Sequence, residues 1–431
     1  MVSSEAVPTP QTDISALPQS RAECEALDLA DPLFRFRQRF ELPDGVLYLD
    51  GNSLGPACRD ARDALSRTVE EEWRTGLIRS WNTAGWVDWP VDLGEQVAGL
   101  IGAAPGQTVV ADGTSINLFK ALVAALRMNA GRSVIVSESA NFPSDLYIME
   151  GAASLFEGTT RRLVPPDATE EEVIALLDDD VAVLSLTHVN YKTARIWDMP
   201  RLTRAAHDHG VLVVWDLAHS AGAVPVRLDD ADADFAVGCG YKYLNGGPGA
   251  PGFIYVARRH LGTAVNPLTG WLGHASPFAF AKEYEPAPDI RSFICGTPQI
   301  LSYAVLKGAL DIFGETDGAA LYAKSQALTD LFIGLVESRC ASAGLRLVSP
   351  RDPDRRGSHV SFAHPNAYAF IQALIARGVI GDFRAPDIAR FGFAPLYNSR
   401  TDVWDAVEIW ADILASGEWQ RPEFAIVKKV T

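Results

Sequence analysis

The stretch "VAVLSLTHVNYKTARIWDMPRLTRAAHDHGVLVVWDLA" (181–218) decides the class of fold. Its two ends, 181–187 and 211–218, consist almost entirely of apolar residues, as in strands buried on both faces of a sheet. Between them, Asp198 is a candidate helix N-cap and Gly210 is a helix stop signal. A strand, a helix and a second strand in this order predict a β-α-β unit with two parallel strands.

The same alternation extends toward the N-terminus. The run "RSVIVSE" (132–138) predicts another buried strand, and "TEEEVIALL" opens with Thr169 and Glu172 at the spacing of a capping box. Repeated β-α units predict an α/β fold, a mainly parallel sheet sandwiched by helices. After about residue 300 a long helix, short strands and two more helices follow, as in a smaller α+β domain. We therefore expect a polar N-terminal tail (1–34), a large domain (35–300) and a small C-terminal domain (301–431).

The composition excludes several classes of function. The chain has 431 residues and a net charge of −16, which disfavours nucleic-acid binding because phosphate neutralisation needs a basic surface. No apolar run approaches the roughly 20 residues that span a bilayer, and the N-terminus does not resemble a signal peptide. The five cysteines are scattered without a C-x-x-C pair, which indicates reduced thiols in a cytoplasm. No H-E-x-x-H motif occurs, and we expect no metal.

A lysine and an aspartate stand at two predicted strand ends. Lys242 lies in the glycine-rich turn "GCGYKYLNGGPG" (238–249), after an apolar run. Asp216 follows four apolar residues, so it lies at the carboxyl end of its strand, where open α/β sheets bind ligands. Alone, Lys242 could be an ion-pair member and Asp216 a helix cap or salt-bridge partner. Together they match pyridoxal phosphate, which needs a lysine for the Schiff base and an acid that keeps the pyridine nitrogen protonated.

Two further segments suit the same cofactor. Thr114 and Ser115 open a predicted helix, and their hydroxyls and the free backbone amides would face a phosphate, although a simple N-cap explains either residue alone. Phe142, at the end of another strand, offers a face on which the cofactor ring can stack. The four elements lie at four predicted strand ends, and we interpret them as one pyridoxal-phosphate site.

The segment from Asp216 to Val256 resembles the class V branch of the fold-type I pyridoxal-phosphate enzymes, where aspartate, histidine and glycine recur before the lysine. Most of that branch has a histidine directly before the lysine, and this chain has Tyr241 there. With that departure, five motifs spread over roughly residues 35–415 resemble the kynureninase family: "YLDGNSLGP" (48–56), "NFPSDLY" (141–147), "LTGWLGH" (268–274), "FICGTPQI" (293–300) and "RFGFAPLYNS" (390–399).

The resemblance implies hydrolysis of L-kynurenine to anthranilate and L-alanine. It assigns Lys242 to cofactor attachment and α-proton removal, Asp216 to the pyridine nitrogen, and Tyr241 to proton transfer and the phosphate. The cofactor contacts that it implies are Thr114, Ser115, Phe142, Pro143, Ser144, Asp145, Thr187, Asp216, His219, Tyr241, Lys242, Trp271 and Thr297. The substrate-binding residues that it implies are Asn52, Ser53, Trp81, Gly296 and Arg390, with Arg390 holding the substrate carboxylate as a bidentate fork.

The resemblance also implies a preferred substrate and a quaternary structure. Trp81 offers only an apolar indole near the aromatic ring, so we expect L-kynurenine to be preferred over 3-hydroxykynurenine. We expect a homodimer, because the active site of this fold type forms at a two-fold interface. Two alternatives stay open: another class V reaction, such as cysteine desulfuration or transamination, and a catalytically silent pyridoxal-phosphate-binding protein.

Overall fold

The computed structural model describes residues 17–428, and residues 1–16 of the expected polar tail lie outside this range. Its larger sheet has seven strands: β2 (Thr108–Val110), β3 (Val134–Glu138), β4 (Thr160–Val164), β5 (Val181–Thr187), β6 (Leu212–Asp216), β7 (Phe235–Cys239) and β8 (Gly252–Val256). Their order is β2-β8-β7-β6-β5-β3-β4. From β4 to β7 the neighbours run parallel, and β8 is antiparallel to β7 and to β2. The expected mainly parallel sheet is confirmed.

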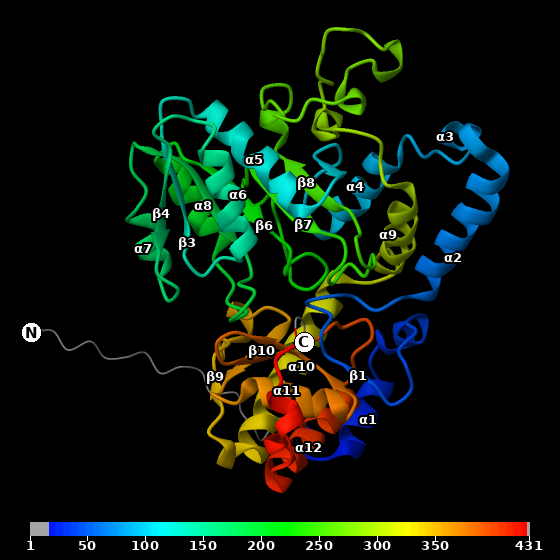
Figure 1. The fold of residues 1–431 in the computed structure, drawn as a ribbon, viewed down its shortest axis with the longest axis vertical. Coiled ribbons are helices and arrows are strands. Elements are labelled where there is room, and N and C mark those ends of the chain that lie inside the picture. Colours follow the sequence, from blue (N-terminus) through cyan, green and yellow to red (C-terminus); the bar gives the residue numbers. More distant parts are fainter. Residues whose placement is uncertain (1–16, 429–431) are drawn as a thin grey trace, which may run out of the picture.

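Helices cover both faces of this sheet: α4 (Trp89–Leu100), α5 (Thr114–Met128), α6 (Pro143–Ala153), α7 (Glu170–Ile174) and α8 (Met199–Asp208) (Figure 1). In β6, Val213 and Trp215 pack into one apolar cluster with α4 and α8, whereas Val214 packs into another with α5 and α6. Successive side chains of a strand point to opposite faces of the sheet. An all-apolar strand therefore needs a helical layer on each side.

The predicted helix caps are present. Thr169 accepts a hydrogen bond from the Glu172 backbone N–H, and the Glu172 carboxylate accepts one from the Thr169 N–H, so the capping box is confirmed. The Asp198 carboxylate accepts a hydrogen bond from the Arg201 N–H at the start of α8. Gly210 has a φ of 69°, the left-handed conformation in which glycine commonly ends a helix.

A second sheet lies below the first in Figure 1 and consists of β12 (Asp382–Arg384), β13 (Ile388–Gly392), β10 (His359–Ala363) and β9 (Arg346–Leu347), in that order and all antiparallel. Three helices belong to this part of the chain: α10 (Gly318–Arg339), α11 (Ala367–Ala376) and α12 (Arg400–Ser416). Phe332, Phe391 and Trp410 join helices and sheet in one apolar cluster. The long helix, short strands and two further helices expected after residue 300 are present, with β9 and β12 in addition to the expected strands.

The N-terminal segment packs on the C-terminal part, which corrects the expectation of a polar tail over residues 21–29. These residues form helix α1 (Arg21–Leu29), and Cys24 is fully buried. The Asp28 carboxylate accepts hydrogen bonds from the backbone N–H groups of Arg400 (2.8 Å) and Thr401 (2.9 Å) at the start of α12. Asp28 thus joins α1 to the N-terminus of α12, which lies more than 370 positions further along the chain.

Helix α10 contributes to both apolar clusters. Helix α9 (Ile300–Phe313) packs into the cluster of the large sheet, and Leu321 of α10 does the same, whereas Leu328 belongs to the cluster of the small sheet. On the N-terminal side, β1 (Leu47–Tyr48) pairs in parallel with β11 (Val379–Ile380). The chain therefore crosses between the two parts more than once.

Residues 59–83 form a short arm. Helix α2 (Arg59–Arg67) packs on α9 and continues as a π-helical segment (Thr68–Gly76), followed by α3 (Ser80–Thr83). This arm projects from the side of the molecule (Figure 1). Over residues 17–428, no helix has the length and apolar character that a membrane crossing requires.

Gly94 is expected to be required for the contact between α4 and β2. A Cβ at this position would stand 2.8 Å from the Val109 Cα, so Gly94→Ala should push α4 off the sheet and lower the free energy of unfolding by about 1–3 kcal/mol. Gly99, in the same helix, has open space around its Cβ position, and Gly99→Ala should instead raise stability by up to about 1 kcal/mol. Urea unfolding measures both changes. Equal changes in the two variants would contradict this packing.

Candidate functional site

The carboxyl ends of the central strands bring together the predicted lysine and aspartate. Asp216 ends β6, and Thr187 ends β5 directly beside it in the register of the two strands. Lys242 follows β7, and its Nζ lies 2.9 Å from Nε2 of His219. Burial, together with the charge of Lys242, lowers the pKa of His219 well below its usual value. The neutral imidazole can therefore accept a hydrogen bond from the lysine ammonium.

Asp216 is a buried carboxylate whose neighbours only partly stabilise its charge. It accepts a hydrogen bond from the Ala218 N–H (2.7 Å) and another from Asp145, which is also buried. Burial raises the pKa of Asp216, and the charge of Lys242 opposes this rise. Burial and the neighbouring Asp216 charge raise the pKa of Asp145 well above its usual value, so Asp145 keeps a proton. The pair holds one negative charge that a cationic ligand would stabilise.

The N-terminus of α5 offers donors for an anion. Gly113 occupies the N-cap without a side-chain hydrogen bond, and Thr114 Oγ1 is buried without a hydrogen-bond partner among the described residues. The preceding Asp112 has a φ of 47° and is held by the ammonium of the buried Lys120. A cleft of about 720 Å³ opens at this point, lined among others by Ser53, Asp112, Gly113, Tyr241 and Gln299.

Two aromatic rings flank the lysine amine. The Lys242 Nζ lies 5.9 Å from the centre of the Phe142 ring and 5.8 Å from that of Tyr241. Phe142 stands at the N-terminus of α6, ahead of Pro143 and Ser144, and its ring meets Tyr191 edge to face. Burial raises the pKa of Tyr241, so its hydroxyl keeps its proton at neutral pH. An aromatic cofactor joined to Lys242 would thus lie among aromatic neighbours.

Arg390 is buried on β13, which lies between β12 and β10 in the small sheet. Its Nε donates to Asp382 Oδ1 (2.7 Å), and its Nη2 donates to Asp382 Oδ2 and to Ser53 Oγ (2.9 Å). Asp382 lies directly opposite Arg390 in the strand pairing. Asn52 is fully buried beside Gly392, and both polar atoms of its amide lack partners among the described residues.

Sequence reasoning missed Asp382, Arg384 and His359. Asp382 and Arg384 alternate along β12, and His359 is a fully buried residue of β10 with both ring nitrogens unpartnered among the described residues. Charged residues alternating in a short strand are unusual beside a buried core. This alternation of charges could have been noticed in the sequence. The pairing of β12 with β13, which places Asp382 against Arg390, could not.

Four predicted residues are not brought to Lys242 within one chain. Trp81 lies on α3, with its ring 5.9 Å from that of Trp86. Trp271 is 37% exposed and packs edge to face on Phe278, and Gly296 and Thr297 are also exposed. The segment carrying Trp271 rises from the top of the large sheet in Figure 1. Within the described residues, no hydrogen bond, ion pair or ring contact joins any of these four residues to Lys242 or Arg390.

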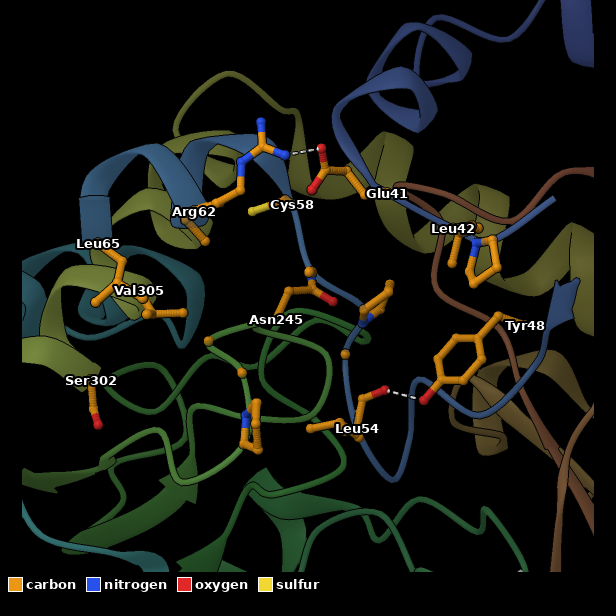
Figure 2. A pocket seen from close by; sticks show the side chains of 18 of the residues that line it. Glu41, Leu42, Tyr48, Leu54, Cys58, Arg62, Leu65, Asn245, Ser302 and Val305 are labelled. Atoms are coloured by element: carbon orange, nitrogen blue, oxygen red, sulfur yellow. Dashed lines mark hydrogen bonds and ion pairs between the residues drawn. The ribbon is translucent and has the colours of Figure 1, made fainter. Parts of the chain in front are cut away.

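A second cavity, of about 870 Å³, borders the glycine-rich turn on a side that Lys242 does not line (Figure 2). Its walls are mainly apolar and include Leu42, Leu65 and Val305 (Figure 2). The Tyr48 hydroxyl donates to the Leu54 carbonyl at its rim (2.7 Å). The cavity holds none of the groups expected to react.

The residues at the carboxyl edge fit pyridoxal phosphate. The uncapped end of α5 and the unpartnered Thr114 hydroxyl suit its phosphate. The buried Asp216 suits a protonated pyridine nitrogen, and the amine of Lys242 is placed to bond the cofactor carbon. Thr114, Asp216 and Lys242 thus each have a matching group on this cofactor.

Similar sequences point to one family. The family description "Kynureninase C-terminal domain" matches residues 321–410. A kynureninase of Pseudomonas fluorescens is 54% identical over 417 residues, which cover 96% of this chain and 100% of that protein. A kynureninase of Burkholderia pseudomallei is 52% identical over 418 residues, again covering 96% of this chain and 100% of that protein.

Solved structures of lower identity share the fold. A cysteine desulfurase from Thermococcus onnurineus NA1 has a TM-score of 0.77 at 18% identity, covering 89% of this chain and 98% of its own. A C-DES variant with glycine linked to its pyridoxal-phosphate cofactor has a TM-score of 0.75 at 17% identity, covering 87% and 99%. At these identities the likeness establishes the fold alone, which is the one predicted.

Asp382→Asn should destabilise the protein strongly, because it leaves the buried guanidinium of Arg390 without its counter-charge. We expect the free energy of unfolding at neutral pH to fall by about 3–5 kcal/mol. The cations beside Asp382 lower its pKa, so its contribution is complete above the usual value of 3.8 and is lost as the pH falls below it. Asp412, 63% exposed and paired with Arg377, gives the control Asp412→Asn, expected to change stability by less than about 1 kcal/mol. Equal losses in urea unfolding would contradict the buried pair.

Proposed function

The chain belongs to the kynureninase family, and we propose from that membership that it hydrolyses the Cβ–Cγ bond of L-kynurenine, giving anthranilate and L-alanine. The observation that carries this proposal is the presence, in a chain 54% identical to a kynureninase, of Lys242 beside His219 and Asp216 at the strand ends. A cleft lined by Tyr241, which directly precedes Lys242, also reaches Ser53, which is bonded to Arg390.

When bound, pyridoxal phosphate supplies an electron sink for charge that develops at the substrate's α-carbon. We propose that Asp216, with Asp145 beside it, keeps the pyridine nitrogen protonated, and that Thr187 supports Asp216 from the next strand. We assign the phosphate to Thr114, Ser115 and the amides of α5, and one face of the ring to Phe142, with Pro143 and Ser144 behind it.

We propose that the ε-amine of Lys242 removes the α-proton of the substrate. His219 holds that amine at 2.9 Å and, being neutral, does not repel it. Tyr241 keeps its hydroxyl proton because burial raises its pKa, which suits a donor of protons during the cleavage. Arg390, with Asn52 and Ser53, would hold the substrate carboxylate at the other end of the cleft.

We propose that the active form is a homodimer in which Trp271, Gly296 and Thr297 serve the neighbouring subunit. Their exposure in the single chain supports this assignment. The same projection carries Phe278 and Phe280, which are 60% and 77% exposed, as expected of apolar side chains that a partner covers. The 870 Å³ apolar cavity of Figure 2 offers a second surface for that partner.

Three further assignments rest on the same proposal. Two structural units, around the seven-stranded and the four-stranded sheet, would enclose the cleft, with the division close to residue 300 shifted into α10. We also propose a cytoplasmic location, which the scattered, unpaired thiols support. We propose that Trp81, which lies away from Lys242 within one chain, borders the substrate's aromatic ring in the proposed dimer and favours L-kynurenine over 3-hydroxykynurenine; a higher kcat/KM for the hydroxylated substrate would contradict this.

Cysteine desulfuration, the activity of a protein with the same fold, is less well supported. A desulfurase needs a reactive thiolate on a mobile loop. Four of the five cysteines are buried, and burial raises the pKa of Cys295, the remaining one. Higher pKa values leave fewer thiolates at neutral pH.

Lys242→Ala should abolish anthranilate formation while leaving the fold intact, because the contacts proposed for the ring and the phosphate do not involve the amine. Anthranilate fluorescence after addition of L-kynurenine measures the first effect, and urea unfolding measures the second. Parental turnover in Lys242→Ala would show that the lysine has been assigned wrongly. Absence of anthranilate with the loaded parent protein would reject the proposed reaction itself.

Mixed dimers test the shared site. Lys242→Ala lacks the amine but can still lend Trp271 to its neighbour, and Trp271→Ala has the reverse defect. Co-expressed chains should form dimers with one intact site, and activity per mixed dimer should recover to about half of the parental value, as two-fold symmetry requires. Activity no greater than the mean of the two pure variants would place Trp271 in its own chain's site or outside any site.

A further inference from the structure

The donors of Arg390 are almost all occupied. A guanidinium carries five N–H groups. Nε and one N–H of Nη2 bond Asp382, the second N–H of Nη2 bonds Ser53 Oγ (2.9 Å), and Nη1 donates to the Tyr191 carbonyl (2.5 Å). One N–H remains, so Arg390 alone cannot hold a carboxylate as a bidentate fork while these bonds are kept.

Arg384 stands beside Arg390 with donors to spare. Its Nη2 donates to Ser53 Oγ (3.0 Å) and to Asp382 Oδ2 (2.5 Å). Its Nε is buried without a hydrogen-bond partner among the described residues. The Arg384 side chain is 32% exposed, whereas that of Arg390 is 1% exposed. Arg384 is therefore the more solvent-accessible of the two arginines.

The charges of this cluster leave room for one anion. Asp382 neutralises one of the two guanidinium groups, and one positive charge remains. Asp50 does not cancel it at neutral pH, because burial and the charge of Asp382 raise its pKa to about 8. His359 adds no charge, since burial and Arg390 lower its pKa well below the usual value. The cluster thus matches a single carboxylate in charge.

An oxygen already occupies the point between the two cations. Ser53 Oγ accepts from both Arg390 and Arg384 and donates to Asp382 Oδ2 (2.7 Å). Ser53 also lines the 720 Å³ cleft together with Tyr241, which directly precedes Lys242 in the sequence. The neighbouring Asn52 amide is buried and lacks partners among the described residues.

We propose that Arg384 is a second recognition residue for the α-carboxylate of the substrate, that the Ser53 hydroxyl holds the place of this carboxylate in the free protein, and that Asp382 positions both guanidinium groups. This inference rests on the proposed function, since an amino-acid substrate supplies the carboxylate. It assigns Arg384 to specificity, and it makes Arg390 part of a pair where a single fork was expected.

The experiment compares L-alanine, which bears the α-carboxylate, with L-alaninamide, which does not, as ligands of the cofactor-loaded protein. Arg384→Gln should weaken L-alanine binding by about 10- to 100-fold, the worth of charge-assisted hydrogen bonds, and leave L-alaninamide binding within about twofold. KM for L-kynurenine should rise by a similar factor, with kcat changed by less than about threefold. Arg384→Lys should fall between, because it keeps the charge but loses the planar fork.

Arg377→Gln is the matched control. Arg377 has a comparable exposure of 37% and also pairs with carboxylates, those of Asp412 and Glu418, away from the cleft. This variant should keep the parental preference for L-alanine over the amide. Unchanged L-alanine binding in Arg384→Gln would overturn the proposal. Equal weakening of both ligands would also overturn it, because that result describes a general structural defect.

Different outcomes reject the proposed reaction and the proposed role of Arg384. If the parent forms no anthranilate from L-kynurenine, the proposed reaction is rejected, and calorimetric titration with the two alanine ligands still decides the role of Arg384. If the parent is active but Arg384→Gln keeps its selectivity between acid and amide, the reaction stands and the second recognition residue is rejected.

Discussion

The buried charge of Asp216 is the constraint on which the rest of the site depends. A carboxylate at the end of a central strand, away from water, costs several kcal/mol unless cations and hydrogen bonds stabilise it. The protein supplies the Ala218 N–H, a proton on Asp145 and the charge of Lys242. The pKa of Asp216 is still raised, so this stabilisation is incomplete without a ligand. A protonated pyridine ring is the group that would complete it.

The small sheet also buries a carboxylate, that of Asp382, and stabilises it with the buried guanidinium of Arg390. Asp382 and Arg390 face each other across two antiparallel strands and neutralise one another in the interior. Arg390 also reaches the Tyr191 carbonyl of the large part, and the Tyr243 hydroxyl donates to the Ser358 carbonyl of the small part (2.9 Å). These bonds connect the two sheets beside the cleft, so the end that binds the carboxylate is positioned relative to Lys242.

The sequence was sufficient to predict those elements that depend on residues close to one another in the chain. The apolar runs at 181–187 and 211–218 predicted adjacent parallel strands, and Thr169 with Glu172 predicted a helix start that the structure contains. The strand-end positions of Asp216 and Lys242 also follow from such runs. The pairing of Asp382 with Arg390 depends on strand register, which residue spacing does not determine.

Long-range packing explains the remaining differences. Helix α1 was expected to be tail because its partner α12 lies at the other end of the chain. Trp271 and Thr297 were expected at the cofactor, yet both are exposed within one chain, and no pattern of apolar residues could distinguish such an exposed loop from a buried one.

The thermal unfolding midpoint of the parent and of Asp216→Asn, each with and without saturating pyridoxal phosphate, tests the central role of the buried charge most directly. Because burial raises the pKa of Asp216, its charge destabilises the cofactor-free fold at neutral pH, and we expect the cofactor-free Asn variant to unfold at a higher temperature than the parent. With cofactor the order should reverse, since only the parent can pair a carboxylate with the protonated ring. An equal rise in midpoint on adding cofactor to both proteins would contradict the claim that this charge is what the ligand completes.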